Sequence, residues 1–167
     1  MAITIRHGYV PGALGRIAEL HARYYHQHWG FGLFFEAKVA ADLAEFLRAY
    51  QPARDRLWTA IDGERIVGSI ALDRRHDPGP AHLRWFILDA GAQGRGLGGQ
   101  LMAELLAFSD QHAVPQIFLN TFAGLDAARH LYERAGFALT HEQLDTTWGV
   151  PVREQRFERL LPPHTSR

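Results

Sequence analysis

The sequence predicts one α/β (α+β) domain over residues 1–161, with a mixed central sheet of about seven strands and about four flanking helices. Three observations carry this prediction. The chain has 167 residues, the length of one domain, and its apolar fraction of 47% is ordinary for a protein that buries a core. Strand-like and helix-like hydrophobic patterns follow one another along it. A glycine-rich stretch, Gln93 to Gly99, joins a predicted strand to a predicted helix.

The N-terminal third predicts a strand followed by two helices. Alternating apolar and polar residues over 3–6 indicate a short strand. Apolar residues at helical spacing from Leu14 to Tyr25 indicate the first helix, which residues 29–32 end. The second helix is expected from about Phe35 to Tyr50.

A hairpin and the strand that feeds the glycine-rich stretch follow. Residues 57–61 and 66–72 flank Asp62-Gly63, a strong hairpin signal. Residues 77–80 mark a second turn, and 82–88 form an apolar strand. The remaining elements are expected to be a helix at 97–112, a strand at 117–121, a helix at 126–135, strands at 138–147 and 152–160, and a loose tail at 162–167.

Composition excludes several classes of function. The formal net charge is zero, which argues against nucleic acid or a membrane surface as a partner. No signal peptide and no membrane-spanning run is present, so we expect a cytoplasmic protein. The absence of cysteine removes disulfides and a thiol nucleophile. The ten histidines lack the spacing of metal ligands, so no metal is expected.

The stretch from Gln93 to Gly99 is the most informative feature. Glycines between a strand and a helix leave backbone N–H groups bare, and the positive end of the helix dipole adds to their attraction for anions. The usual anion at such a place is a phosphate or a pyrophosphate. The chain is therefore expected to bind a phosphorylated cofactor.

Two glycine-loop chemistries fit this stretch poorly. A P-loop requires Gly-Lys-Ser/Thr, whereas Gly99 is followed by Gln100 and Leu101. The dinucleotide pattern G-x-G-x-x-G is matched by Gly94, Gly96 and Gly99. However, the five residues Asp89 to Gln93 separate the strand from Gly94, where that fold has a tight turn. The next strand also has no Asp or Glu near its end to bind a ribose.

A third pattern fits. Gln93-x-x-Gly96-x-Gly98 resembles the Gln/Arg-x-x-Gly-x-Gly/Ala motif of the GNAT superfamily, the acyl-CoA-dependent N-acyltransferases. The later stretch LYERAGF, residues 131–137, resembles that family's "LYE…GF" segment. The resemblance covers roughly residues 3–160. In detail the chain is similar to the acetyltransferase half of bacterial proteins that fuse a MarR-type regulator to a GNAT domain.

The resemblance implies acetyl-CoA (coenzyme A) as the cofactor and a GNAT fold whose sheet splays at the cofactor strand. The cofactor would enter that split, with its pyrophosphate on the loop N–H groups. The implied cofactor-binding residues are Phe86, Ile87, Leu88, Gln93, Gly94, Arg95, Gly96, Leu97, Gly98, Gly99, Asn120 and Tyr132. One departure is Leu125, where many members carry an asparagine that touches the cofactor arm.

The resemblance also implies catalytic roles. The Leu88 N–H would stabilise the oxyanion, and Tyr132 would protonate the departing thiolate. His82 is the candidate base, because its ordinary pKa suits the task, and it predicts a rate that rises through an apparent pKa of about 6 to 7.5. Asn120 is the rival position, where an amide would only position a water. Without cysteine, transfer is expected to be direct within a ternary complex.

The first helix pair and the last hairpin wall the acceptor site in this family. The implied substrate-binding residues are His28, Trp29, Arg84 and Trp148, whereas Phe34 and Phe35 are expected in the core. An aromatic lining suits a small-molecule amine or a peptide end. The identity of the amine stays open, as does the choice between a monomer and a homodimer.

Three classes of function are thus compared. An N-acetyltransferase is favoured over a non-catalytic acyl-CoA sensor or regulatory module. The sensor would bind the cofactor without amine-dependent release of thiol. A nicotinamide enzyme would bind NAD in place of coenzyme A.

Overall fold

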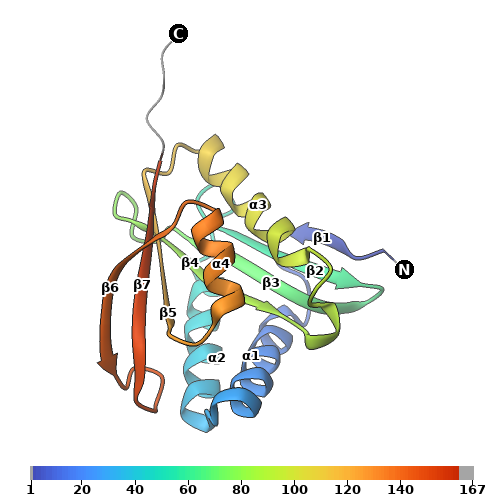
Figure 1. The fold of residues 1–167 in the computed structure, drawn as a ribbon. Coiled ribbons are helices and arrows are strands. Elements are labelled where there is room, and N and C mark those ends of the chain that lie inside the picture. The colour runs from blue at the N-terminus through green and yellow to red at the C-terminus, as the bar shows by residue number, and fades with distance from the viewer. Residues whose placement is uncertain (1, 162–167) are drawn as a thin grey trace.

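The structure is a computed structural model that describes residues 2–161, so the predicted loose tail at 162–167 lies outside it. The seven strands form one sheet of order β1-β2-β3-β4-β5-β7-β6 (Figure 1). They are β1 (Thr4–His7), β2 (Arg56–Asp62), β3 (Arg65–Asp73), β4 (Ala81–Leu88), β5 (Gln116–Phe122), β6 (Ala138–Asp145) and β7 (Val152–Leu160). The four α-helices are α1 (Ala13–Trp29), α2 (Leu33–Arg48), α3 (Leu97–Gln111) and α4 (Asp126–Arg134). The predicted fold class is therefore confirmed.

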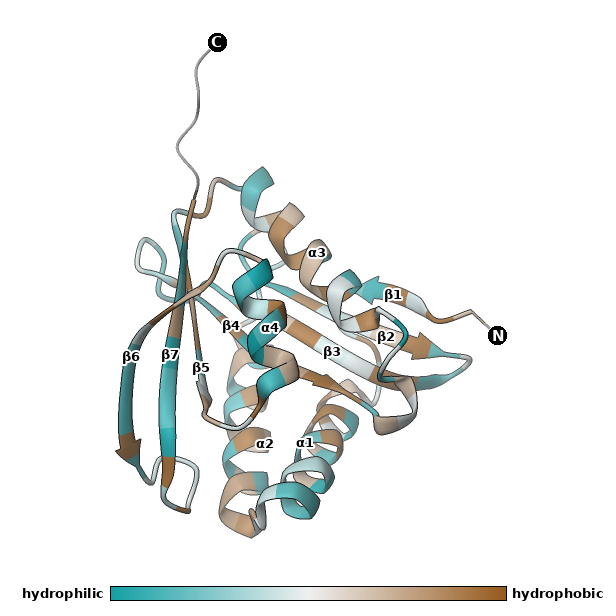
Figure 2. Cartoon of the chain, viewed as in Figure 1, coloured by the Kyte–Doolittle hydropathy of each residue, from teal (hydrophilic) through white to brown (hydrophobic). Residues whose placement is uncertain are grey.

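Two hydrophobic clusters lie on opposite faces of the sheet. One joins α3, Tyr132 and Phe137 to residues such as Ile70 and Leu119. The other joins α1 and α2 to residues such as Ala71 and Trp85. Figure 2 shows the outer hairpin β6–β7 as largely hydrophilic along its middle, whereas β3 is mostly neutral or hydrophobic. The hairpin therefore contributes polar side chains to a sheet that is otherwise covered on both faces.

The sheet opens between β4 and β5, its one parallel pair. These strands are registered only at Ala81–Ile117 and His82–Phe118, although β4 continues to Leu88. Beyond that point the two strands splay apart (Figure 1). The split that the family resemblance implies is therefore present.

A bulge in β4 lies next to the split. The pairing of β3 with β4 shifts between Ser69 and Ala71, and Trp85 has a φ of 49°, a left-handed conformation that is uncommon for a bulky residue. The Ser69 hydroxyl donates a hydrogen bond of 2.6 Å to the Trp85 carbonyl and holds the bulge. The extra residue turns Trp85 toward the α1–α2 cluster and Phe86 toward the α3 cluster. The apolar run at 82–88 carried no signal for this bulge.

Candidate active site

The glycine loop forms a cradle of backbone N–H groups at the end of β4. Gly94 and Gly96 have φ of 78° and 76°, so both need the left-handed conformation that glycine adopts without strain. Gly96 is the N-cap of α3, and no side chain caps that helix. The first N–H groups of α3 therefore have no intrahelical acceptor and point outward, as an anion site requires.

Close packing holds the loop against the split. A Cβ built at Gly98 would lie 3.0 Å from Leu131 Cδ1 and 3.5 Å from Phe86 Cζ. A Cβ at Gly99 would meet nothing within 4 Å, so this position faces open space. Gln93, Gly94, Arg95 and Gly96 are exposed. The open side of the loop is therefore free for a ligand, while the buried side is packed.

Asp89 anchors the start of the loop to two other elements. Its carboxylate lies 3.0 Å from Arg16 Nη2 on α1 and 3.1 Å from Arg65 Nη2 on β3. A short 3₁₀ turn, Ala90–Ala92, then leads into the loop. The five residues before Gly94, Asp89 to Gln93, are too many for a dinucleotide-binding turn, and here they form an anchored turn.

The Leu88 backbone faces the split. The N–H of the next residue, Asp89, donates to Val67 O on β3 at 2.7 Å. Because successive backbone groups of a strand point to alternate edges, the Leu88 N–H and carbonyl point away from β3. Gln93 Nε2 lies 3.5 Å from the Leu88 carbonyl, in keeping with that direction. The donor proposed for an oxyanion thus lies at the edge that β5 leaves open.

A cavity of about 490 Å³ beside the split is lined by residues from both faces of the sheet, but Ile87, Leu88 and the glycine loop do not line it. From the α1–α2 side it is lined by Tyr25, Phe35, Lys38 and Asp42, and from the α4 side by Tyr132. Other lining residues are His82, Arg84, Trp85, Phe86, Asn120, Phe122, Asp145, Thr147, Trp148, Glu154 and Arg156. This volume lies within the range for small-molecule sites. The cavity brings together predicted site residues from β4, β5, α4 and the β6–β7 hairpin.

Tyr132 lies at the α4 end of this cavity. Its ring is 6% exposed and packs against Phe86, Phe137 and Phe157 with centroids 5.9–6.2 Å apart. Burial raises the pKa of the Tyr132 hydroxyl above its ordinary value of 10.0. The phenol therefore stays protonated at any working pH, and the residue lines the cavity.

His82 differs from the expectation that it titrates near neutral pH. Its ring stacks on Phe118 with centroids 4.2 Å apart and planes at 19°. Burial, and next the positive charge of Arg84, lower the pKa of His82 from 6.5 to about 3. The imidazole is therefore neutral at pH 7, but its conjugate acid is too strong to hold a proton taken from an ammonium group. The predicted titration of His82 between about 6 and 7.5 is wrong for this environment.

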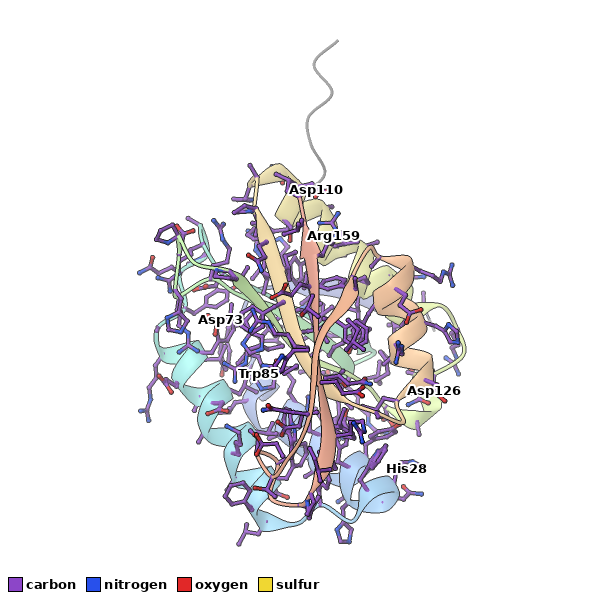
Figure 3. The ribbon with its side chains drawn as sticks, turned by 60° about the vertical axis from the view of Figure 1, so that its left-hand side comes forward. His28, Asp73, Trp85, Asp110, Asp126 and Arg159 are labelled. Atoms are coloured by element: carbon purple, nitrogen blue, oxygen red, sulfur yellow. The ribbon has the colours of Figure 1, made fainter. Side chains whose placement is uncertain are left out.

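Arg84 shares the cavity with His82, but other groups already bind its guanidinium. It lies 3.3 Å from Asp42 Oδ2 and 3.4 Å from Asp73 Oδ2, and it covers the Trp85 ring at 4.3 Å. Figure 3 labels Asp73 and Trp85. Two carboxylates thus neutralise the charge of this predicted substrate-binding residue.

Only some of the aromatic residues predicted to line the acceptor site lie in the cavity. Trp148 and Phe35 line the cavity with centroids 5.9 Å apart. Trp29 instead packs edge-on against Phe122 at 4.7 Å and is not a lining residue. His28 is exposed near the end of α1, away from Trp85 (Figure 3). Phe34, expected in the core, is 62% exposed.

Several polar lining residues were missed by sequence reasoning, namely Lys38, Asp42, Asp145, Thr147, Glu154, Gln155 and Arg156. On β7, Glu154 and Arg156 alternate with the more deeply buried Gln155 and Phe157, and this alternation was the available signal. Across residues 2–161, no group of three or more metal-ligating side chains gathers. Within the same range, no helix combines the length and the apolar character needed to cross a membrane.

The model of one protein family matches most of this chain. The model of the Acetyltransferase (GNAT) family aligns with residues 14–137, which include the glycine loop and Tyr132. The protein belongs to the GNAT family. The match runs from α1 to the end of α4, so it includes the glycine loop and both strands that flank the split in this GNAT protein.

Solved structures show the same fold at low identity. A GNAT-family acetyltransferase from Staphylococcus aureus MU50 is 19% identical, with a TM-score of 0.75 over 96% of this chain and 100% of that one. A Salmonella typhimurium protein assigned as an acetyltransferase, solved with its cofactor acetyl-CoA, is 16% identical, with a TM-score of 0.77 over 100% and 98%. The ribosomal-protein-alanine N-acetyltransferase of Brucella melitensis is 17% identical, with a TM-score of 0.72 over 95% and 99%.

Proposed function

We propose that this GNAT protein transfers an acetyl group from acetyl-CoA to a primary amine, by direct transfer in a ternary complex. One observation carries the proposal: a cavity beside the split between β4 and β5 is lined from both faces of the sheet. A donor on the α3–α4 side and an acceptor on the α1–α2 side would meet at the edge of β4. The acetyl-CoA complex from Salmonella and the N-acetyltransferase from Brucella, which have the same fold, support this proposal by similarity.

The residues present fit acetyl-CoA. Bare N–H groups from Gly94 to Gly99 suit a pyrophosphate, and an added Cβ at Gly98 would crowd Leu131. Phe86, Ile87, Leu88, Asn120 and Tyr132 would hold the arm that reaches into the split. When bound, acetyl-CoA supplies the acetyl group as a thioester.

The chain's own groups would then serve the transfer. The Leu88 N–H would stabilise negative charge on the carbonyl oxygen. As the new C–N bond forms and the C–S bond breaks, Tyr132 would donate a proton to the sulfur and regain one from solvent. The nitrogen would lose its excess proton to water near Asn120, which is exposed at the cavity. The neutral His82 ring would position the amine and would not store the proton.

The test is release of thiol from acetyl-CoA in the presence of amines, peptide N-termini and aminoglycosides. Because the chain contains no cysteine, the protein itself contributes no thiol to the background of the assay. We expect release that depends on an amine and yields one acetylated product per thiol. Tight binding of acetyl-CoA without release for any of these acceptors would favour the sensor, the alternative that the resemblance to MarR–GNAT fusions keeps open.

A further inference from the structure

We propose that the acceptor is an amine with a second positive charge, and that Glu154 binds this charge. The inference rests on the proposed function and names the class of its acceptor. It starts from one side chain on β7 that lines the cavity. The Thr147 hydroxyl donates to Glu154 Oε2 at 3.2 Å, whereas Glu154 Oε1 is buried and has no hydrogen-bond partner among the described residues.

An unpartnered buried carboxylate oxygen is costly, because it has lost water without gaining a donor. Native proteins keep few such atoms, and an ordered water, an ion or a ligand can supply the missing donor. Here the Glu154 side chain lies in the wall of a cavity of about 490 Å³, although Oε1 itself is covered by the surrounding protein. A donor on the bound acceptor would therefore satisfy Oε1.

The pairing of charges around the cavity shows which donor fits. Each lining lysine or arginine already has a carboxylate: Lys38 pairs with Asp42 at 3.0 Å, Arg84 with Asp42 at 3.3 Å, and Arg156 with Glu158 at 2.8 Å. By contrast, Glu154 and Asp145 have no ion-pair partner within residues 2–161. The charge left uncompensated in the cavity is thus negative, which favours a cationic acceptor over an acidic one.

Aromatic rings surround the same position. Glu154 is the strand partner of Phe122 on β5, whose ring lies 6.2 Å from that of Trp148. Trp148 lies 5.9 Å from Phe35. The faces of such rings attract an ammonium group. A carboxylate beside aromatic rings is therefore suited to hold an alkyl ammonium.

The place of Glu154 in the sheet indicates a second charge and not the reacting amine. The order β4-β5-β7 puts Glu154 two strands away from the β4 edge where Leu88 lies. Two strand spacings amount to about 10 Å, and the split widens the first of them. The reacting nitrogen must be neutral and next to β4, so the charge at Glu154 belongs to another group at the far end of the acceptor.

Three six-carbon probes separate the possibilities: hexamethylenediamine, hexylamine and aminocaproate carry the same reactive amine and end in an ammonium, a methyl or a carboxylate group. Binding of each probe to the protein saturated with coenzyme A is measured by calorimetry, and kcat/KM is measured by thiol release. We expect the wild type to favour the diamine over hexylamine by roughly ten- to a hundredfold, the range for a hydrogen bond to a charged group. Aminocaproate should be the poorest.

The variant Glu154→Gln should remove the preference for the diamine and leave hexylamine within about twofold. Glu142→Gln is the matched control, because Glu142 lies on the neighbouring strand, binds Gln155 at 2.7 Å and does not line the cavity. If Glu154→Gln fails to fold, as judged by its circular dichroism, the wild-type series still decides the acceptor class, and loss of the diamine preference in Asp145→Asn would assign the cation to Asp145 and overturn the role of Glu154.

Equal binding of the diamine and hexylamine by the wild type would overturn the inference, as would an undiminished diamine preference in folded Glu154→Gln. Faster turnover of hexylamine or aminocaproate would leave the acetyltransferase proposal intact and refute only the acceptor class. Diamine binding that depends on Glu154 without thiol release would support the cation site and refute the proposed function.

Discussion

Acidification should destabilise this protein through His82. The ring is held against Phe118, and burial lowers its pKa to about 3. In the unfolded chain a histidine keeps a pKa of about 6.5. As the pH falls below 6.5 the unfolded state takes up a proton that the folded state refuses. The stability that neutral His82 contributes is therefore complete above pH 6.5 and is lost as the pH falls toward 3.

The size of this loss at pH 5 follows from the unfolded state alone. Protonating a group with a pKa of about 6.5 at pH 5 stabilises the unfolded chain by RT ln(1 + 10^1.5), about 2 kcal/mol. The folded pKa of His82, about 3, lies well below 5, so the folded state gains almost nothing in return.

Urea denaturation at pH 7.5 and pH 5.0 measures the effect, with the wild type compared to His82→Gln. Glutamine is polar but does not titrate. Between pH 7.5 and pH 5.0 the free energy of unfolding of His82→Gln should therefore fall by about 2 kcal/mol less than that of the wild type. His21, whose pKa burial lowers to about 4, is present in both proteins and cancels. Parallel losses in the two proteins would refute the reasoning, as would a His82 ring signal that titrates between pH 5 and 8 by NMR.

The same low pKa makes a kinetic prediction. His82 cannot produce a rate limb between pH 6 and 7.5, so kcat/KM should rise about tenfold per pH unit up to the pKa of the free amine, near 10 for an alkyl amine. The profile should keep this slope in His82→Gln. A wild-type plateau that begins between pH 6 and 7.5 and disappears in this variant would restore His82 as the base.

Three further predictions concern single side chains. Gly99→Asp should keep the fold, because a Cβ at this position meets open space and an acidic residue suits the first turn of a helix. Its negative charge beside the pyrophosphate should weaken acetyl-CoA binding about tenfold or more, and Gly99→Asn is the uncharged control. Equal affinity in both variants would contradict the cradle. Tyr132→Phe should lower kcat by roughly a hundredfold to ten-thousandfold at unchanged stability, and a loss under about threefold with rate-limiting chemistry would make Tyr132 structural. Asp55→Ala should lower the free energy of unfolding by about 3 kcal/mol in thermal or urea denaturation, because the fully buried Asp55 carboxylate accepts a 2.8 Å hydrogen bond from the Arg74 N–H. Asp77→Ala is the control: Asp77 is exposed, so the free energy of unfolding should change by under about 1 kcal/mol.

The sequence by itself determined the elements and the position of the glycine loop. The strand at 152–160 was predicted at its observed bounds, and the helix after the loop begins at Leu97 as expected. These predictions succeed because hydrophobic period, turn residues and the conformational freedom of glycine act over a few neighbouring residues. The family motifs then placed Tyr132 and the loop in one fold.

The tertiary structure decided the rest of the candidate site. The left-handed Trp85 in the β4 bulge, the low pKa of His82 and the packing of Trp29 against Phe122 each depend on a segment far away in the chain. The unpartnered oxygen of Glu154 is likewise a property of everything around it. A side chain's type is written in the sequence, but its hydration, its charge partners and the space before it are set by neighbours that only the folded sheet and helices bring together.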